Sequence, residues 1–168
     1  MAGPGAGVLD RATGLVQGPR RAHAQGPHVN AVQASVTVPV DPATAFQIFT
    51  DEIDRWYVRG RYSWIDPARA VGIRFEDGCL RELWSDGGHV DTGKIVAWEP
   101  PHRLVWADLI NKTGRMEIEV AFSPVDGGTE VVLEHRGLDT LPSDVADRIR
   151  RGLSWNIALR WYADQWKA

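Results

Sequence analysis

Residues 32–49, VQASVTVPVDPATAFQIF, contain the change from strand to helix on which the fold assignment depends. Over residues 32–38, valine and alanine alternate with polar residues, which is the period of a half-buried β-strand. Pro39 ends this strand. Asp41 is a suitable helix N-cap, because Pro42 fits the first helical position and apolar side chains follow at helical spacing. The sequence therefore predicts a strand that leads directly into a helix.

Six further strands are predicted downstream, after a second short helix around residues 51–57 and a loop over 58–70. Turn sequences rich in Asp, Asn, Gly and Pro separate them. Such short connections favour an antiparallel sheet, because parallel strands need crossovers of a dozen or more residues. The predicted strands cover residues 71–75, 79–84, 89–98, 103–109, 116–122 and 129–136.

The segment after Pro142 predicts one long helix over residues 143–166, with Ser143 as its N-cap. A helix of this length is the only predicted element large enough to cover the apolar face of the sheet. The predicted fold class is therefore α+β. It consists of a curved seven-stranded antiparallel sheet wrapped around a long C-terminal helix, with two short helices after the first strand.

The composition indicates one globular domain and excludes several classes of partner. The chain has 168 residues and a net charge of −3, so nucleic acid, which needs a basic surface, is not an expected partner. A single cysteine excludes an intramolecular disulfide and a cysteine-based zinc site. Neither a membrane-spanning run nor a secretory signal is recognisable, and we expect a cytoplasmic protein without membrane insertion.

Residues 1–28 differ in composition from the rest of the chain, because half of them are Gly, Ala or Pro. Such a segment cannot bury enough apolar surface to offset the entropy of ordering it. We therefore predict a flexible tail at 1–28 and a domain at 29–168.

The eight tryptophans indicate either a tryptophan-rich core or a wide apolar wall around a ligand.

Three segments and three residues of the last predicted helix carry a resemblance to a known family. The segments are 36–46 (VTVPVDPATAF), 93–104 (GKIVAWEPPHRL) and 128–137 (GTEVVLEHRG), and the helix residues are Trp155, Leu159 and Tyr162. Together they resemble the START-like, or polyketide cyclase/dehydrase, superfamily, and within it the branch of the activator of heat-shock-protein-90 ATPase. The resemblance implies a helix-grip fold around a deep, mostly apolar cavity between sheet and helix. Members of the superfamily bind lipids, hormones or polyketides, or catalyse reactions on them.

Two polar residues fall near the middle of the apolar arc of the C-terminal segment when it is drawn as one helix. Asn156 and Arg160 are four residues apart and are therefore neighbours on that face. We predict that both point into the cavity as ligand-binding residues. Arg160 would then pair with Glu82, Asp91 or Asp108, or with an acidic or carbonyl group of a ligand. The alternative is that Arg160 reaches out into solvent.

Glu82 and His135 are the candidate catalytic residues. Glu82 shares a strand face with Leu80 and Trp84, which would place a carboxylate between large apolar side chains. His135 lies on the apolar face of the last strand, and histidine is the usual proton carrier near neutral pH. Either residue can equally be a structural group of the core.

The remaining candidates are ligand-binding residues. Trp84 and Trp106 are predicted to line the cavity. The aromatic residues near the two short helices are predicted to surround the cavity mouth; these are Trp56, Tyr57, Tyr62 and Trp64. Asp91 is a further polar candidate, but with His89 it supplies too few ligands for a metal, and we predict no metal site and no cofactor.

These observations favour a protein that binds a small hydrophobic or amphipathic molecule, as a monomer or a homodimer. The first alternative is a cofactor-independent cyclase, dehydratase or isomerase that acts on a polyketide-like or aromatic substrate by acid/base chemistry. The second is a protein-interaction domain similar to the co-chaperone for which the branch is named.

Overall fold

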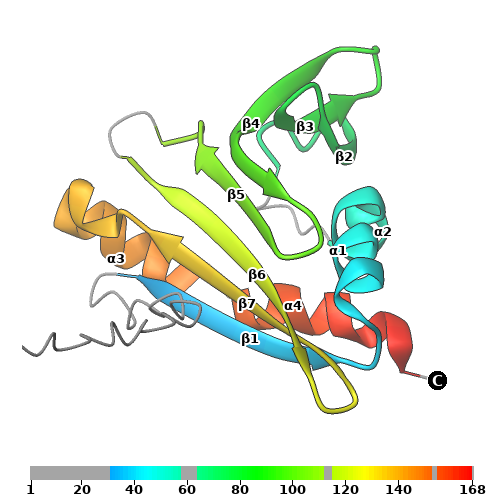
Figure 1. Ribbon diagram of the computed structural model, residues 1–168. Coiled ribbons are helices and arrows are strands. Elements are labelled where there is room, and N and C mark those ends of the chain that lie inside the picture. The colour runs from blue at the N-terminus through cyan, green and yellow to red at the C-terminus, as the bar shows by residue number, and fades with distance from the viewer. Residues whose placement is uncertain (1–30, 58–63, 112–114, 153–154, 168) are drawn as a thin grey trace, which may run out of the picture.

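The computed structural model describes residues 31–57, 64–111, 115–152 and 155–167. The predicted tail at 1–28 and Tyr62 lie outside these residues. Seven strands form one antiparallel sheet in the order β1-β7-β6-β5-β4-β3-β2, which confirms the predicted sheet (Figure 1). The strands are β1 (Val32–Val38), β2 (Ala70–Glu76), β3 (Cys79–Trp84), β4 (His89–Glu99), β5 (Arg103–Asp108), β6 (Glu117–Val125) and β7 (Gly128–Arg136).

The sheet is strongly curved, and β1 is joined to β7, the last strand of the chain. Register irregularities interrupt the β2–β3, β3–β4 and β4–β5 pairs. Because a bulge bends the strand that contains it, these irregularities concentrate the curvature in the half of the sheet formed by β2 to β5.

Two short helices follow β1 as predicted, α1 (Pro42–Asp51) and α2 (Ile53–Trp56). The Asp41 carboxylate caps α1 by accepting hydrogen bonds from the backbone N–H groups of Ala43 and Thr44 at 2.9 and 3.1 Å. The buried face of α1 packs its phenylalanines against Phe122 of β6. The helix pair therefore closes one end of the curved sheet (Figure 1).

The C-terminal segment contains two helices where the sequence predicted one, α3 (Ser143–Gly152) and α4 (Trp155–Ala163). Their buried faces belong to different clusters. Ala146 of α3 packs with Met116, Leu138 and Leu141, whereas Leu159 and Tyr162 of α4 belong to the main core under the sheet. Short 3-10 turns precede α3 at Leu138–Thr140 and follow α4 at Asp164–Trp166.

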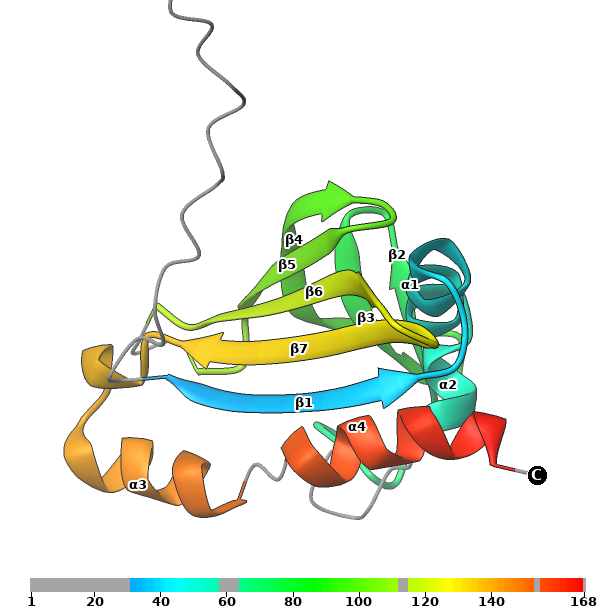
Figure 2. The same ribbon diagram turned by 60° about the horizontal axis from the view of Figure 1, so that its bottom comes forward.

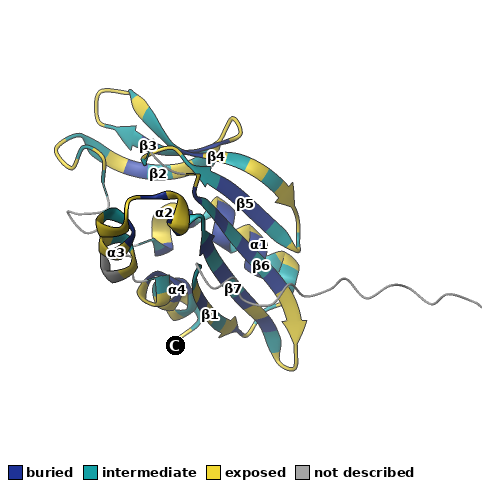
Figure 3. Ribbon diagram, turned by 90° about the vertical axis from the view of Figure 1, so that its left-hand side faces the viewer, coloured by how far each residue is buried: buried dark blue, intermediate teal, exposed yellow. Residues whose placement is uncertain are grey.

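Helix α4 lies along β1 below the concave side of the sheet (Figure 2). The buried Tyr162 hydroxyl donates a hydrogen bond to the Ala45 carbonyl at 2.6 Å, which ties α4 to α1. Buried residues concentrate on β5, β6 and β7, where these strands face the helices (Figure 3). The sheet and α4 thus enclose the core, and α3 covers the far end of the same concave side.

Candidate functional site

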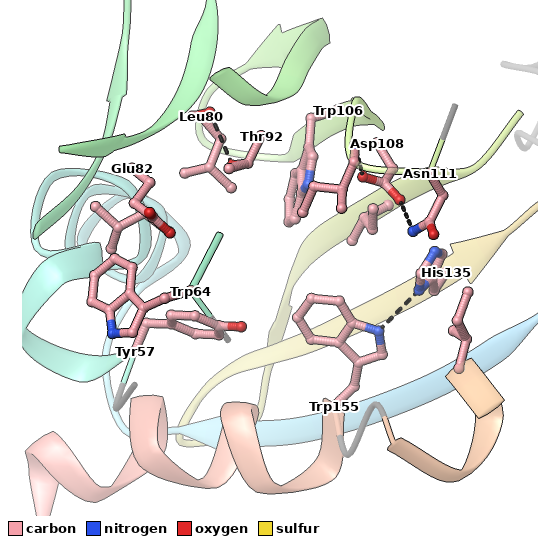
Figure 4. A pocket seen from close by; sticks show the side chains of 14 residues that line it. Tyr57, Trp64, Leu80, Glu82, Thr92, Trp106, Asp108, Asn111, His135 and Trp155 are labelled. Atoms are coloured by element: carbon pink, nitrogen blue, oxygen red, sulfur yellow. Dashed lines mark hydrogen bonds between the residues drawn. The ribbon is translucent and has the colours of Figure 1, made fainter. Parts of the chain in front are cut away.

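A cavity of about 290 Å³ lies between the concave face of the sheet and helices α3 and α4 (Figure 4). Its described wall is mainly apolar and aromatic, made by Tyr57, Trp64, Ile73, Leu80, Trp106, Ile110, Ile118, Ile149 and Trp155. Five polar residues complete it, Glu82, Thr92, Asp108, Asn111 and His135. An apolar wall with a few polar groups is the usual composition of a small-molecule site, and this volume is at the lower end of the common range.

His135 is a deeply buried polar group of the wall, with 3% of its surface exposed. Its Nδ1 accepts a hydrogen bond from the indole N–H of Trp155 at 3.3 Å, so the neutral ring carries its hydrogen on Nε2. Burial lowers the pKa of His135 below its usual value, and the nearby Asp108 carboxylate offsets part of this effect. Within the described part of the chain, Nε2 has no hydrogen-bond partner.

Asp108 and Asn111 form a polar corner at the end of β5 (Figure 4). The two Asp108 oxygens accept hydrogen bonds from the Ile110 backbone N–H and the Asn111 side-chain amide, each at 2.8 Å. The Thr92 hydroxyl donates to the Leu80 carbonyl at 3.0 Å. Asp108 and Thr92 therefore present oxygen acceptors to their surroundings, whereas the Asn111 amide keeps its oxygen and a second N–H.

Glu82 is buried, with 2% of its surface exposed, and no cation of the described residues pairs with it. Its carboxylate accepts three hydrogen bonds, from the backbone N–H groups of Ile65 and Asp66 at 2.7 and 3.0 Å and from the Trp84 indole at 2.9 Å. The residue predicted as an acid/base group thus holds the loop that carries Trp64 against β3. Glu82 lines the cavity and at the same time anchors its rim.

Three of the predicted aromatic residues do line the cavity, namely Tyr57, Trp64 and Trp106. Trp106 lies over Gly93, where a β-carbon would come within 2.6 Å of the Trp106 Cδ1 atom. Gly93 therefore leaves the space on β4 that the indole of the neighbouring strand occupies.

Arg160 and Asn156 lie elsewhere than the sequence predicted. Both are exposed, and neither contributes to the wall of the cavity. Asn156 instead borders a shallow depression beside β1 and β7. The reason is that α3 and α4 have apolar stripes of different phase, and drawing them as one helix placed this polar pair at the centre of a combined arc.

Trp56, Trp84 and Asp91 also lie outside the wall of the cavity. Trp56 is a core residue whose indole donates to the Phe49 carbonyl at 3.0 Å. Trp84 is covered by the guanidinium of Arg69, 3.9 Å from its ring centroid. Asp91 accepts a hydrogen bond from Arg81 Nε at 2.8 Å, and this guanidinium holds the pKa of Asp91 below its usual value. Asp91 is opposite Arg81, which lies between the wall residues Leu80 and Glu82 on β3, so both side chains lie on the face away from the cavity.

Trp155 was not predicted as the partner of His135, and neither Asn111 nor Thr92 was predicted as a wall residue. The position of Trp155 at the first turn of α4 was readable from its spacing to Leu159 and Tyr162. Its hydrogen bond to His135 could not be predicted, because 20 residues separate the two in the chain.

The family model described as "Activator of Hsp90 ATPase homolog 1-like protein" matches residues 39–159. Three solved structures share the fold at low sequence identity. A Rhodobacter sphaeroides protein is 19% identical with a TM-score of 0.59, covering 83% of this chain and 95% of its own. CalU16 from Micromonospora echinospora is 19% identical with a TM-score of 0.54, covering 82% and 74%. The Aha1 dimer from Colwellia psychrerythraea is 16% identical with a TM-score of 0.55, covering 80% and 93%.

No curated protein matches the chain in sequence. None of the helices that the structure describes is long and apolar enough to span a membrane. Among the described residues, no cluster of three or more His, Cys, Asp or Glu side chains is arranged to hold a metal ion.

Proposed function

Because this chain belongs to the family of activator of Hsp90 ATPase homolog 1-like proteins, we propose that it binds a small, mainly apolar molecule in the cavity under its sheet. The family and the fold support a ligand-binding or cyclase-like function in general. The observation that carries the finer proposal is the buried His135, whose Nε2–H lacks a partner among the described residues and which lies in a mainly apolar cavity wall. A buried donor without a partner is costly, and a ligand acceptor would satisfy it.

The state of the titratable groups favours binding over acid/base catalysis. A general base needs a free lone pair that faces the substrate. The Nδ1 lone pair of His135 already accepts from Trp155, and the Glu82 carboxylate already accepts three hydrogen bonds. The cyclase-type alternative therefore requires that the Trp155 hydrogen bond to His135 breaks, or that Glu82 acts through the one lone-pair position that its three donors leave. The co-chaperone-like alternative rests on the family name, and no described contact favours it.

The test uses N-phenyl-1-naphthylamine, a neutral apolar dye whose fluorescence rises in an apolar environment. We expect saturable binding to the full chain with one site. Ile149 lines the cavity from α3, so Ile149→Trp should fill space that the dye needs and weaken binding about tenfold or more.

The matched control is Ile157→Trp on α4, because Ile157 is 43% exposed and outside the cavity wall. This variant should bind the dye as the unmodified chain does. Equal affinity of the two variants, or dye binding that does not saturate, would mean that the cavity is not the site. Native mass spectrometry of the purified chain adds an independent search for a bound molecule.

A further inference from the structure

We propose that the cavity selects neutral ligands that carry a carbonyl-type oxygen and rejects carboxylates of the same shape. The selection would come from His135 as the donor and from Asp108 and Glu82 as fixed negative charges. This inference rests on the proposed binding function and deepens it, because it names the chemical class of the ligand.

Trp155 determines the direction of the hydrogen bond that His135 can make to a ligand. Trp155 Nε1 has only a hydrogen to give, so the His135 Nδ1 that contacts it must be the acceptor. The neutral ring is left with a hydrogen on Nε2, which is buried and lacks a partner among the described residues. This Nε2–H is the donor of His135 to which a carbonyl, ether or hydroxyl oxygen of a ligand can bind.

The described wall of the cavity is negatively charged. Asp108 and Glu82 contribute carboxylates, and none of the described residues that line the cavity is Lys or Arg. Asn111 gives an amide hydrogen to Asp108, and Thr92 gives its hydroxyl hydrogen to Leu80. A ligand carboxylate would therefore lose its hydration and meet two like charges, with only neutral donors such as the His135 Nε2–H as compensation among the described wall residues.

Hydrogen bonds hold this negative charge in place. Asp108 is fixed by hydrogen bonds to Ile110 and Asn111, and Glu82 by three donors on β3 and the adjoining loop. If either side chain turned away, these donors would lose a charged acceptor, although water could replace it at the exposed Ile65 and Ile110. The hydrogen bonds therefore favour the positions in which both carboxylates repel an anion. This is the reverse of a site in which Arg160 would have attracted an acidic ligand, because Arg160 is exposed.

The test compares three probes of nearly the same shape: 2-acetonaphthone, 2-isopropenylnaphthalene and 2-naphthoate. They present a carbonyl oxygen, a methylene group and a carboxylate at one position. Quenching of the fluorescence of the tryptophans in the wall measures each dissociation constant at pH 7.5. We expect the ketone to bind about tenfold more tightly than the alkene. The carboxylate should bind at least about tenfold more weakly than the ketone.

Three variants assign the selection to its residues. His135→Phe should remove the preference for ketone over alkene, whereas the exposed His89→Phe should leave it unchanged. Trp155→Phe removes the donor that keeps the His135 hydrogen on Nε2, so this hydrogen can also lie on Nδ1. The preference for ketone over alkene should then be reduced but not abolished. Asp108→Asn should improve 2-naphthoate binding at least about fivefold with little change for the ketone, because it removes a charge and keeps the shape.

The outcomes separate the two proposals. Equal binding of all three probes would leave the cavity a binding site and overturn the selection proposed here. Tighter binding of 2-naphthoate than of the ketone would overturn it as well. If none of the probes binds and N-phenyl-1-naphthylamine does not bind either, both proposals fail together. If His135→Phe does not fold, the Asp108→Asn result decides the charge argument and the Trp155→Phe result decides the donor argument.

Discussion

Replacing Glu82 by Gln should destabilise the fold, although the two side chains have the same shape. The carboxylate is 2% exposed and accepts hydrogen bonds from Ile65, Asp66 and Trp84. Oε1 serves Asp66 and Trp84, and Oε2 serves Ile65. The amide of Gln keeps one acceptor oxygen and turns an N–H group toward the remaining donor. One charge-assisted hydrogen bond is lost, and the other two become neutral ones.

Hydrogen bonds to charged groups contribute about 1.5–3 kcal/mol each, and neutral ones about 1 kcal/mol. Ile65 is exposed, so water partly replaces the bond that its N–H loses. We therefore expect Glu82→Gln to lower the free energy of unfolding by about 2 kcal/mol. Glu82→Leu, which leaves all three donors without an acceptor, should lower it by about 3–5 kcal/mol.

Urea denaturation followed by tryptophan fluorescence measures both values, and an unchanged m-value identifies a true loss of stability. The matched control is Glu130→Gln on β7, an exposed position where the change should stay within about 0.5 kcal/mol. A Glu82→Gln protein as stable as the unmodified chain, or more stable, would refute the reasoning. Such a result would mean that the buried carboxylate is a net cost to the fold, as expected of a group kept for catalysis.

Burial lowers the pKa of His135 in the native chain below its ordinary value of about 6.5. Just below pH 6.5 the unfolded chain therefore binds more protons than the native chain, and the free energy of unfolding should fall as the pH drops. The slope is at most about 1.4 kcal/mol per pH unit, and urea titrations from pH 7.5 to 5 should find this component missing in His135→Phe. Thr129→Val should cost about 1–3 kcal/mol in the same assay, because the fully buried hydroxyl donates to the Val40 carbonyl at 2.7 Å; the exposed Thr37→Val is its control. Arg160→Leu should change stability by less than about 0.5 kcal/mol and leave dye binding unaltered, and a loss above 2 kcal/mol would instead indicate a buried partner for this guanidinium.

The elements that the sequence predicted best are those whose signals are local. The alternation over Val32–Val38, the cap at Asp41 and the turns between strands each depend on residues a few positions apart, and the observed elements follow them closely. The order of the sheet was predictable too, because short connections leave few ways to join successive strands. These features required no knowledge of what the strands would face.

Tertiary packing alone determined which faces of the C-terminal helices are buried. An apolar stripe can be read from a helix only if the helix is continuous, and here two helices face two clusters, one around Met116 and one under the sheet. Arg160 was therefore placed in the cavity by the sequence and lies in solvent in the structure.

The chemistry of the cavity likewise depends on contacts between distant parts of the chain. The sequence identified Glu82 and His135 as polar residues on apolar strand faces, and both are buried. It could not identify what they bind, because Ile65 and Asp66 reach Glu82 from a loop 17 and 16 residues away and Trp155 reaches His135 from another helix. A polar side chain on an apolar face signals that a partner exists, but only the folded chain selects that partner, because hydrogen bonds depend on position in space and not on separation along the sequence.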